Sequence, residues 1–259
     1  YARHDPKGCL IATENGKIIG SGFIHLRGET ASIGPVSVSP EHQSRGVGRT
    51  IMEALLEIGS RASSIRLIQD SFNTLSFSLY TKLGFQVYDV VLSLLLREPG
   101  DFRPPSLAPE DYPQSEREIR LVEKTDLSGI LALDRQVMGY DRAKDFTLLI
   151  NEGVGLINKL RHSDQIDSYI FCYSYRENNL FIGPGVAFNM DYLFNLLAEL
   201  IKRNAAAWMR VKIFAGQSDM PRFLLDSGFK IIGIGAFMVK GNYERSAGRQ
   251  FLAQFPEVL

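Results

Sequence analysis

The chain has 259 residues, of which 45% are hydrophobic and 22% are charged. This balance indicates a globular protein with its own core, and it excludes disordered, collagen-like and highly charged tail proteins. The 29 basic and 29 acidic side chains give a formal charge of zero, which removes the broad positive field that non-specific nucleic-acid binding needs. Domains usually contain about 100 to 200 residues, so we expect two.

The cysteines and histidines show no ligand spacing. Cys9 and Cys172 lie far apart, and we interpret both as reduced and buried; the four histidines are scattered, so no metal site is predicted. The longest strongly apolar run, Val90 to Leu96, is far shorter than the about 20 residues of a membrane span. The chain starts at Tyr1 without a signal or transit pattern, so we expect a cytoplasmic fragment or processed chain.

The first hundred residues alternate strand and helix patterns. Strand-like runs at Cys9 to Glu14 and Ile18 to Leu26 flank Asn15-Gly16, a hairpin dipeptide, and a third run, Ala31 to Ser39, stops at Pro40. The remaining predicted elements are a helix at 48–62, a strand at 65–69, a helix at 74–83 and a strand or strand pair at 85–96. This half is therefore of mixed α/β class.

A Pro-rich stretch divides the chain. It contains Pro99, Pro104, Pro105, Pro109 and Pro113. Packed helix and strand interiors accept proline poorly, so we expect an N-terminal domain at 1–98, a linker at 99–117 and a C-terminal domain at 118–259. The last is predicted to open with a strand at 118–122 and a helix at 127–137.

The second half contains a shortened copy of the first. Ile33-Gly34-Pro35 recurs as Ile182-Gly183-Pro184, and Gly84-Phe85 recurs as Gly228-Phe229. The second interval is five residues shorter, and the deletion falls on a Gly-rich turn, since the later segments overlay without a gap. The alternative is that both halves share only a common strand-helix-strand order.

The Gly-rich turn, Pro40-Glu41-His42-Gln43-Ser44-Arg45-Gly46-Val47-Gly48-Arg49, predicts an anion site. The first amides of a helix lack intrahelical partners and lie at the positive end of its dipole, so they can converge on a phosphate. Gly46 and Gly48 have no Cβ to obstruct a pyrophosphate, while Arg45 and Arg49 add positive charge. An ordinary turn is the alternative, and neither a Rossmann fingerprint nor a P-loop is present.

In this setting, Gln43, Gly46 and Gly48 resemble the signature of the GNAT superfamily of acyl-CoA-dependent N-acyltransferases. The resemblance implies two α/β domains, each a twisted, mixed and mostly antiparallel sheet flanked by helices. It implies acetyl-CoA as co-substrate, with the backbone of one strand pairing with the pantetheine arm. The cofactor-binding residues that it implies are Val36, Ser37, Val38, Gln43, Ser44, Arg45, Gly46, Val47, Gly48, Arg49 and Asn73.

The resemblance further implies that Tyr80 is the acid that protonates the departing thiolate. A phenol has a pKa near 10 and stays protonated at neutral pH, so it can donate to the sulfur. A core aromatic residue is the alternative for Tyr80. Glu29 and His25 are candidate general bases, each with an ordinary strand or turn role as its alternative.

The second copy is predicted to be non-catalytic. Leu224 stands where the overlay places Tyr80, and leucine cannot donate a proton. Compared with the family pattern, we expect the family's first strand and first two helices to be missing before the strand at Cys9, and we expect the second copy to keep them. The run that starts at Asp134 resembles the C-terminal domain of tandem GNAT proteins, where the matching residues face a binding cleft. The implied substrate-binding residues are Asp134, Tyr140, Asp141 and Arg142; a structural Asp134–Arg142 ion pair with Tyr140 as packing is the alternative.

The sequence thus predicts an N-acetyltransferase that transfers an acetyl group from acetyl-CoA to a primary amine. We expect a small-molecule acceptor in preference to a protein amine, with no nucleic-acid or membrane partner, and the oligomeric state stays open. One alternative is a non-catalytic acyl-CoA sensor, which the missing elements favour and Tyr80 disfavours. The other is a turn that binds a different phosphorylated ligand, such as a nucleotide.

Overall fold

The structure is a computed structural model that describes residues 5–104, 116–174, 179–204, 208–217 and 219–252. Its described residues form two compact units. The N-terminal unit contains 5–89 and 235–244, and the C-terminal unit contains 90–234 and 245–252. Each unit therefore draws residues from both halves of the sequence.

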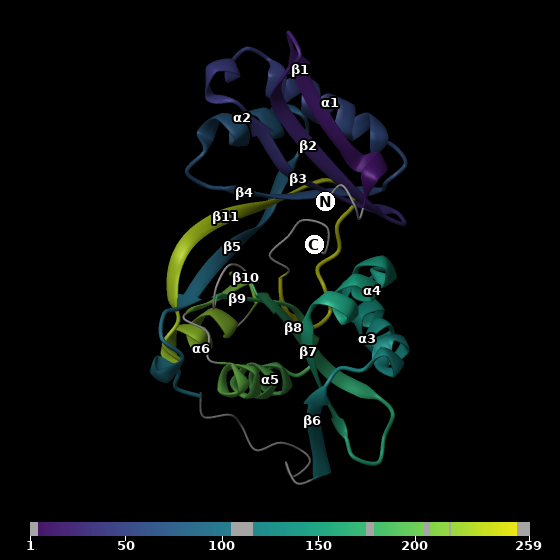
Figure 1. Cartoon of the computed structure of the whole chain (residues 1–259), viewed down its shortest axis with the longest axis vertical. Coiled ribbons are helices and arrows are strands. Elements are labelled where there is room, and N and C mark those ends of the chain that lie inside the picture. Colours follow the sequence, from purple (N-terminus) through teal and green to yellow (C-terminus); the bar gives the residue numbers. More distant parts are fainter. Residues whose placement is uncertain (1–4, 105–115, 175–178, 205–207, 218, 253–259) are drawn as a thin grey trace. The chain divides into compact units, whose positions relative to one another are not determined.

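The sheet of the N-terminal unit has the strand order β1-β2-β3-β4-β11 (Figure 1). β1 (Cys9–Glu14), β2 (Lys17–Arg27) and β3 (Thr30–Val38) form an antiparallel meander. β4 (Ser64–Asp70) is parallel to β3 and antiparallel to β11 (Lys230–Gly241). The predicted hairpin and the next two strands are confirmed, with ends that differ by one or two residues.

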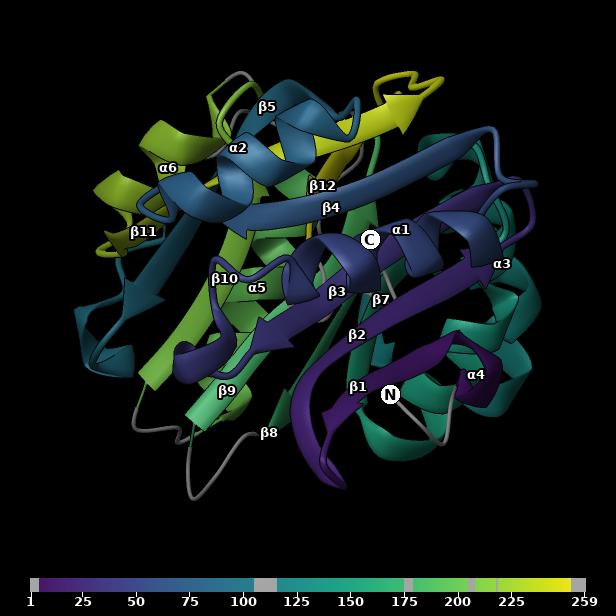
Figure 2. The same cartoon turned by 90° about the horizontal axis from the view of Figure 1, so that it is seen from above.

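Two helices cover one face of this sheet. α1 (Val47–Ile58) contributes Met52 and Leu55 to the same core cluster that contains Tyr80 of α2 (Thr74–Lys82). Figure 2 shows α1 lying across β2 and β3. The predicted helix at 48–62 ends earlier in the structure because Gly59 is the C-cap residue of α1.

The sheet of the C-terminal unit has the order β5-β10-β9-β8-β7-β6, with β12 beside β9. Its neighbours are antiparallel except β9 and β10, which are parallel. The strands are β5 (Gln86–Leu96), β6 (Arg117–Leu121), β7 (Val154–Leu160), β8 (Ile166–Ser174), β9 (Asn179–Ala187), β10 (Trp208–Phe214) and β12 (Arg249–Phe251).

Both faces of this second sheet are covered by helices. Ile170 and Cys172 of β8 pack in one core cluster with α5 (Met190–Arg203) and α6 (Met220–Asp226). Tyr169 and Phe171, which point to the opposite face, pack with α3 (Leu127–Met138) and α4 (Ala143–Glu152). Short 3-10 helices occur at Pro6–Gly8, Pro40–His42, Pro99–Asp101 and Lys124–Asp126.

The cysteines are both free thiols, but only one is buried. Cys172 has no exposed surface, as predicted, whereas Cys9 is half-buried near the start of β1, so its predicted burial is wrong. The described residues contain no cluster of three or more metal-ligating side chains. Within the same residues, no helix combines the length and apolar composition that crossing a bilayer requires.

The internal repeat is present in the backbone as well as in the sequence. β3, α1, β4, α2 and β5 recur in the same order as β9, α5, β10, α6 and β11. The Gly34–Pro35 and Gly183–Pro184 peptide bonds are both cis, and the pairing register shifts in the preceding strand of each copy, β2 and β8.

The last strand of each copy belongs to the unit that contains most of the other copy. Met238 of β11 pairs with Leu67 of β4, while Leu94 of β5 pairs with Val211 of β10. The predicted ranges 1–98 and 118–259 therefore describe sequence copies, and the compact units differ from them by this exchange. Part of the predicted linker, residues 105–115, lies outside the described residues.

Candidate active site

The N-terminus of α1 is free to accept a ligand. Gly46 is its N-cap residue, no side chain caps the first turn, and this turn contains no acidic residue. The amides of Val47, Gly48 and Arg49 belong to the first turn, where backbone donors have no partner inside the helix. This helix end therefore keeps the donors and the positive field that attract a phosphate.

The two glycines of the turn have different physical roles. Gly46 has a φ of 90°, in the left-handed region where a side chain is strained. A Cβ added to Gly48 would meet only Val38 Cγ2 at 3.6 Å and Leu79 Cδ2 at 3.8 Å, which are ordinary van der Waals contacts. The backbone favours glycine at position 46, whereas at position 48 the fold itself would accept alanine.

One side chain of the Gly-rich turn bonds it to β3, and two arginines of the turn are exposed. Gln43 Nε2 donates a hydrogen bond to the carbonyl oxygen of Val38 at 3.3 Å, which ties the turn to the end of β3. Arg45 and Arg49 are exposed, and Arg49 pairs with Glu53 at 3.5 Å. Exposed pairs contribute little to stability, so this guanidinium can turn to an anion at small cost.

β3 presents an open backbone edge beside the turn. It pairs with β4 only from Thr30 to Ser32, whereas its pairing with β2 continues to Val38. On the side away from β2, Val36, Ser37 and Val38 pair with no strand in the described part of the chain. An extended ligand with amide groups can add hydrogen bonds along such an edge.

Asn73 caps α2 with one half of its carboxamide. Its Oδ1 accepts a hydrogen bond from the backbone amide of Ser76 at 3.1 Å, and its NH₂ group is left for a ligand. Asn73 is exposed, and its neighbours Phe72 and Leu75 are 84% and 65% exposed. The NH₂ group of Asn73 is therefore an available donor beside exposed apolar side chains.

Tyr80 lies inside the core of the N-terminal unit. Its side chain is 9% exposed and meets the ring of Phe85 edge-on, with 6.1 Å between the ring centroids. Burial raises the pKa of Tyr80 above its ordinary value. The raised pKa keeps the phenol protonated at neutral pH, and no residue in the described part of the chain hydrogen-bonds to its hydroxyl, so the O–H can donate to a ligand.

The two candidate bases lie on β2 and in the turn between β2 and β3. His25 is fully buried; its Nδ1 is 2.7 Å from Asp5 Oδ2, and burial lowers its pKa although Asp5 opposes the shift. Glu29 is exposed in the turn before β3, at the far end of that strand from Val38, about 30 Å away by the rise of a strand. No base is assigned from these positions.

Gln69 is a buried polar residue that sequence reasoning missed. It is 6% exposed at the end of β4, and its Oε1 accepts a hydrogen bond from Ser76 Oγ at 2.8 Å. Its Nε2 is buried and has no hydrogen-bond partner in the described part of the chain. Ser76 and Tyr80 are one turn apart on α2 and so lie on the same face of this helix. Gln69, which is bonded to Ser76, therefore packs against the face of α2 that carries Tyr80. The only sequence signal was a polar residue closing an apolar strand.

The second copy differs at the helix that corresponds to α1. Only residues 188 and 189 separate β9 from α5, so the long turn is absent. Asn189 Oδ1 accepts a hydrogen bond from the amide of Asp191 at 2.8 Å, and the Asp191 carboxylate lies in the first turn. Leu224, the counterpart of Tyr80, is fully buried. A capped helix end that carries negative charge does not favour a phosphate.

Asp134 and Arg142 form a buried ion pair in the C-terminal unit. They are 1% and 2% exposed, the Arg142 guanidinium donates to both carboxylate oxygens of Asp134, and the Tyr169 hydroxyl donates to the same carboxylate. This geometry is that of the structural ion pair named as the alternative. A substrate contact at these two residues stays a prediction.

Tyr140 and Asp141 have separate surroundings. Asp141 is exposed, pairs with Arg135 at 2.6 Å and accepts a hydrogen bond from the amide of Ala143 at 2.7 Å. Tyr140 is half-buried, with the Arg142 guanidinium 5.9 Å from its ring centroid. Their predicted role in substrate binding also stays a prediction.

Comparisons with known proteins agree with this architecture. The model of the acetyltransferase (GNAT) family matches residues 1–85, and the model of an acetyltransferase (GNAT) domain matches residues 130–252. The chain therefore belongs to the GNAT acetyltransferase family and carries two GNAT domains, as predicted. No curated protein matches it.

Solved structures show the same fold over nearly the whole chain. A Pyrococcus horikoshii protein described as an acetyltransferase is 22% identical, with a TM-score of 0.75 over 97% of this chain and 81% of that one. A GCN5-related N-acetyltransferase from Sphaerobacter thermophilus is 11% identical, with a TM-score of 0.62 over 95% and 82%. A tandem GNAT protein from the clavulanic acid biosynthesis pathway is 10% identical, with a TM-score of 0.58 over 93% and 84%.

Proposed function

We propose that the chain is an N-acetyltransferase whose N-terminal GNAT domain binds acetyl-CoA and whose acceptor is the primary amine of a small molecule. The observation that carries the proposal is the uncapped N-terminus of α1 beside the open edge of β3. The first-turn amides would hold the pyrophosphate, and the edge would pair with the amides of the pantetheine arm.

The residues of the domain fit acetyl transfer. The amine nitrogen attacks the thioester carbonyl, a C–N bond forms as the C–S bond breaks, and the sulfur takes a proton from the Tyr80 hydroxyl. The proton that the amine loses passes to water or to a base that we do not assign, and the Tyr80 phenolate regains a proton from solvent after the thiol leaves. The raised pKa of Tyr80 keeps its hydroxyl protonated at neutral pH, as an acid requires.

The C-terminal GNAT domain is not proposed to bind acetyl-CoA. Asn189 caps its corresponding helix, and Asp191 adds negative charge to the first turn. A phosphate there would lose a backbone donor and meet a like charge. A cytoplasmic location and the lack of a nucleic-acid or membrane partner stay predictions.

A non-catalytic acyl-CoA sensor is the second candidate function. Its support is the burial of Tyr80, which is 9% exposed within the core cluster of the N-terminal unit. A phenol confined to the core would leave the sulfur without an acid. The sensor and the enzyme share the acyl-CoA site and differ only in turnover.

The experiment that tests the proposal measures thiol release from acetyl-CoA with a thiol-reactive dye, over a panel of amines. The panel contains amino sugars, polyamines, free amino acids and a lysine peptide. Release that requires one small amine supports the proposal, and release only with the peptide replaces the small-molecule acceptor by a protein amine. Binding without release for any acceptor identifies the sensor, and the absence of binding contradicts both.

A further inference from the structure

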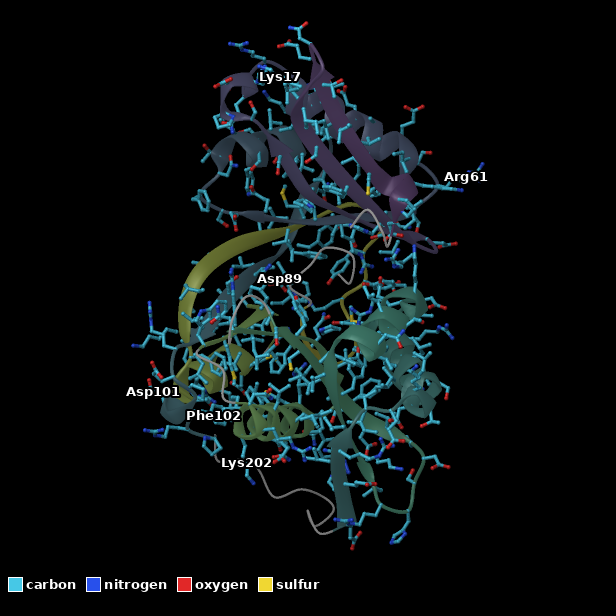
Figure 3. The ribbon with its side chains drawn as sticks, in the orientation of Figure 1. Lys17, Arg61, Asp89, Asp101, Phe102 and Lys202 are labelled. Carbon is cyan, nitrogen blue, oxygen red and sulfur yellow. The ribbon has the colours of Figure 1, made fainter. Side chains whose placement is uncertain are left out.

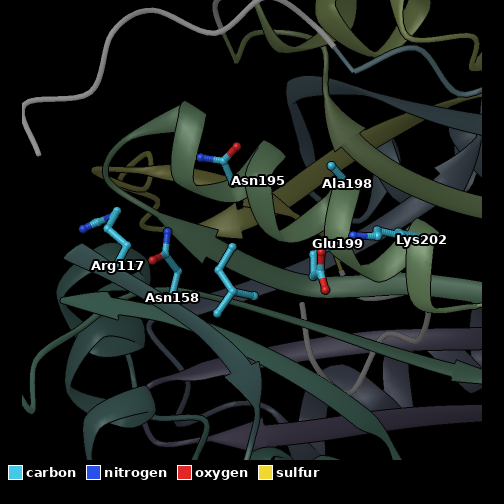
Figure 4. Close-up of a pocket in the computed structure, with 7 residues that line it drawn as sticks. Arg117, Asn158, Asn195, Ala198, Glu199 and Lys202 are labelled. Carbon is cyan, nitrogen blue, oxygen red and sulfur yellow. The ribbon is translucent and has the colours of Figure 1, made fainter. Parts of the chain in front are cut away.

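A pocket in the C-terminal unit lies outside every residue assigned so far. It has a volume of about 420 Å³ and lies between one stripe of α5 and the edge strand β6 with its neighbour β7 (Figure 4). Pockets for small molecules usually have volumes of about 300 to 1,000 Å³. The lining residues are Arg117, Ile119, Asn158, Asn195, Ala198, Glu199 and Lys202.

Regular spacing brings these side chains together. On α5, the four lining residues follow the i, i+3, i+4, i+7 pattern of one helix face. On the sheet, Ile119 of β6 is the direct pairing partner of Asn158 of β7, so both point to the face that α5 covers. The pocket is therefore built by regular elements.

Asn158 is the strongest indication of a ligand. Its side chain is 1% exposed, and neither Nδ2 nor Oδ1 has a hydrogen-bond partner in the described part of the chain. Buried polar groups almost always have partners, and asparagine is a poor strand residue. An apolar side chain would fit the interior of β7 better, so the carboxamide is explained by a partner that supplies both an acceptor and a donor.

Charged side chains complete the pocket. Glu199 and Lys202 lie on the same stripe of α5, and Lys202 is exposed (Figure 3). Among the described residues none pairs with the Lys202 ammonium, whereas Glu199 accepts a hydrogen bond from Arg203 Nε at 2.6 Å. Arg117 also lines the pocket, and its guanidinium is fixed in place by an ion pair with the Asp167 carboxylate at 2.9 Å.

We propose that this pocket binds a small zwitterionic amino acid whose side chain ends in a carboxamide. The ligand carboxamide would exchange two hydrogen bonds with Asn158, because each group offers one donor and one acceptor side by side. The α-carboxylate would pair with Lys202, and the α-ammonium would pair with Glu199. None of the residues proposed to bind acetyl-CoA lines this pocket, so the amino-acid site can be tested independently of the proposed function.

The test is calorimetric titration of the whole chain with L-glutamine as the probe. We expect binding with one site per chain, at least tenfold weaker binding for Lys202→Gln and loss of binding for Asn158→Leu. Lys230→Gln, an exposed lysine at the start of β11, is the matched control and should bind as the parent does. Asn158→Leu should melt at the same temperature as the parent or higher, since it removes unpaired buried groups.

Several outcomes would overturn the assignment. One is that L-glutamine does not bind, and another is that L-glutamate binds as tightly, since a carboxylate has no donor for Asn158. A third is that Asn158→Leu binds L-glutamine unchanged. If Asn158→Leu does not fold, Lys202→Gln decides the matter, because its exposed side chain has no packing role. A crystal structure grown with L-glutamine that holds only water at Asn158 would also refute the site.

Discussion

At the scale of single residues, the proposed acyl-donor site depends on the difference between Gly46 and Gly48. Of the two, only Gly46 has a positive φ, which favours glycine for backbone reasons. Gly48 has room for a Cβ against Val38 and Leu79, so nothing within the N-terminal unit excludes alanine there. We attribute the glycine at position 48 to the ligand that lies over its amide.

Gly48→Ala should therefore separate binding from stability. We expect acetyl-CoA to bind roughly tenfold more weakly or worse, a change of about 1.4 kcal/mol, because the methyl group enters the space of the pyrophosphate. The melting temperature should not fall, since alanine favours a helix over glycine. Titration calorimetry and thermal melting measure the two effects. Gly100→Ala, where a Cβ meets nothing within 4 Å, is the matched control. If the parent chain, Gly48→Ala and Gly100→Ala bind acetyl-CoA with equal affinity, the pyrophosphate does not bind at this helix end.

Tyr80→Phe tests the acid. The fold should persist, because the hydroxyl has no partner in the described residues, while kcat should fall about 100-fold or more if the phenol protonates the sulfur. Since burial raises the Tyr80 pKa, ionisation of this residue should not reduce kcat of the parent below about pH 10. The contribution of the buried neutral phenol to the free energy of unfolding is likewise complete below about pH 10 and is lost as the pH rises through the raised pKa of Tyr80. A kcat–pH profile that is the same for Tyr80→Phe and the parent would exclude Tyr80 as the acid.

At the scale of elements, the two copies differ in how their corresponding helices begin. α1 starts after a long turn and has no side-chain cap, whereas α5 starts two residues after β9 and is capped by Asn189. In the first copy the amides at the start of the helix are therefore available to a ligand, whereas in the second copy the Asn189 side chain accepts a hydrogen bond from one of them. This contrast explains why acetyl-CoA is assigned to the N-terminal domain alone.

Asn73→Asp should keep helix α2 and weaken acetyl-CoA binding. Aspartate caps a helix as well as asparagine does, so the hydrogen bond to Ser76 survives. The substitution removes the NH₂ donor and adds negative charge beside an anionic ligand, so we expect a roughly tenfold loss of affinity at an unchanged melting temperature. Asn73→Ala, which also loses the cap, should cost about 1 kcal/mol of stability. If Asn73→Asp binds as the parent does, Asn73 is a capping residue and not a ligand contact.

The element order was predictable from sequence because its signals are local. Asn15-Gly16 predicted the first hairpin, and the glycines after β3 predicted the start of α1. The strand partners of residues 85–96 and 230–241 were not predictable, since both runs are apolar and periodicity does not identify the neighbouring strand. The unused donor of Gln69 was also hidden, because burial of a polar side chain is a property of the packed fold.

At the scale of the whole molecule, the exchange of final strands makes each compact unit depend on the other half of the sequence. β11 completes the sheet that contains the residues proposed to bind acetyl-CoA, and β5 completes the sheet of the C-terminal unit. An edge strand without its partner exposes a row of unpaired backbone groups. Neither half of the sequence therefore encodes a complete unit.

Reciprocal core substitutions test this dependence. Met238→Ala and Leu94→Ala each truncate a fully buried side chain, at a cost of about 2–5 kcal/mol. Met238→Ala should speed amide hydrogen exchange in β2 and β3, whereas Leu94→Ala should speed it in β8 and β9. Exchange measured by mass spectrometry distinguishes the two patterns. Faster exchange confined to the half of the sequence that carries each substitution would contradict the strand exchange.

The most direct measurement of the central claim is the melting temperature of this chain with and without saturating acetyl-CoA, with ATP as the control. A ligand that binds only the folded state stabilises it by about 2.7 kcal/mol at 100 times its dissociation constant. We predict a rise with acetyl-CoA that ATP does not reproduce and that Gly48→Ala reduces. No rise, or an equal rise with ATP, would contradict an acyl-CoA site at the N-terminus of α1.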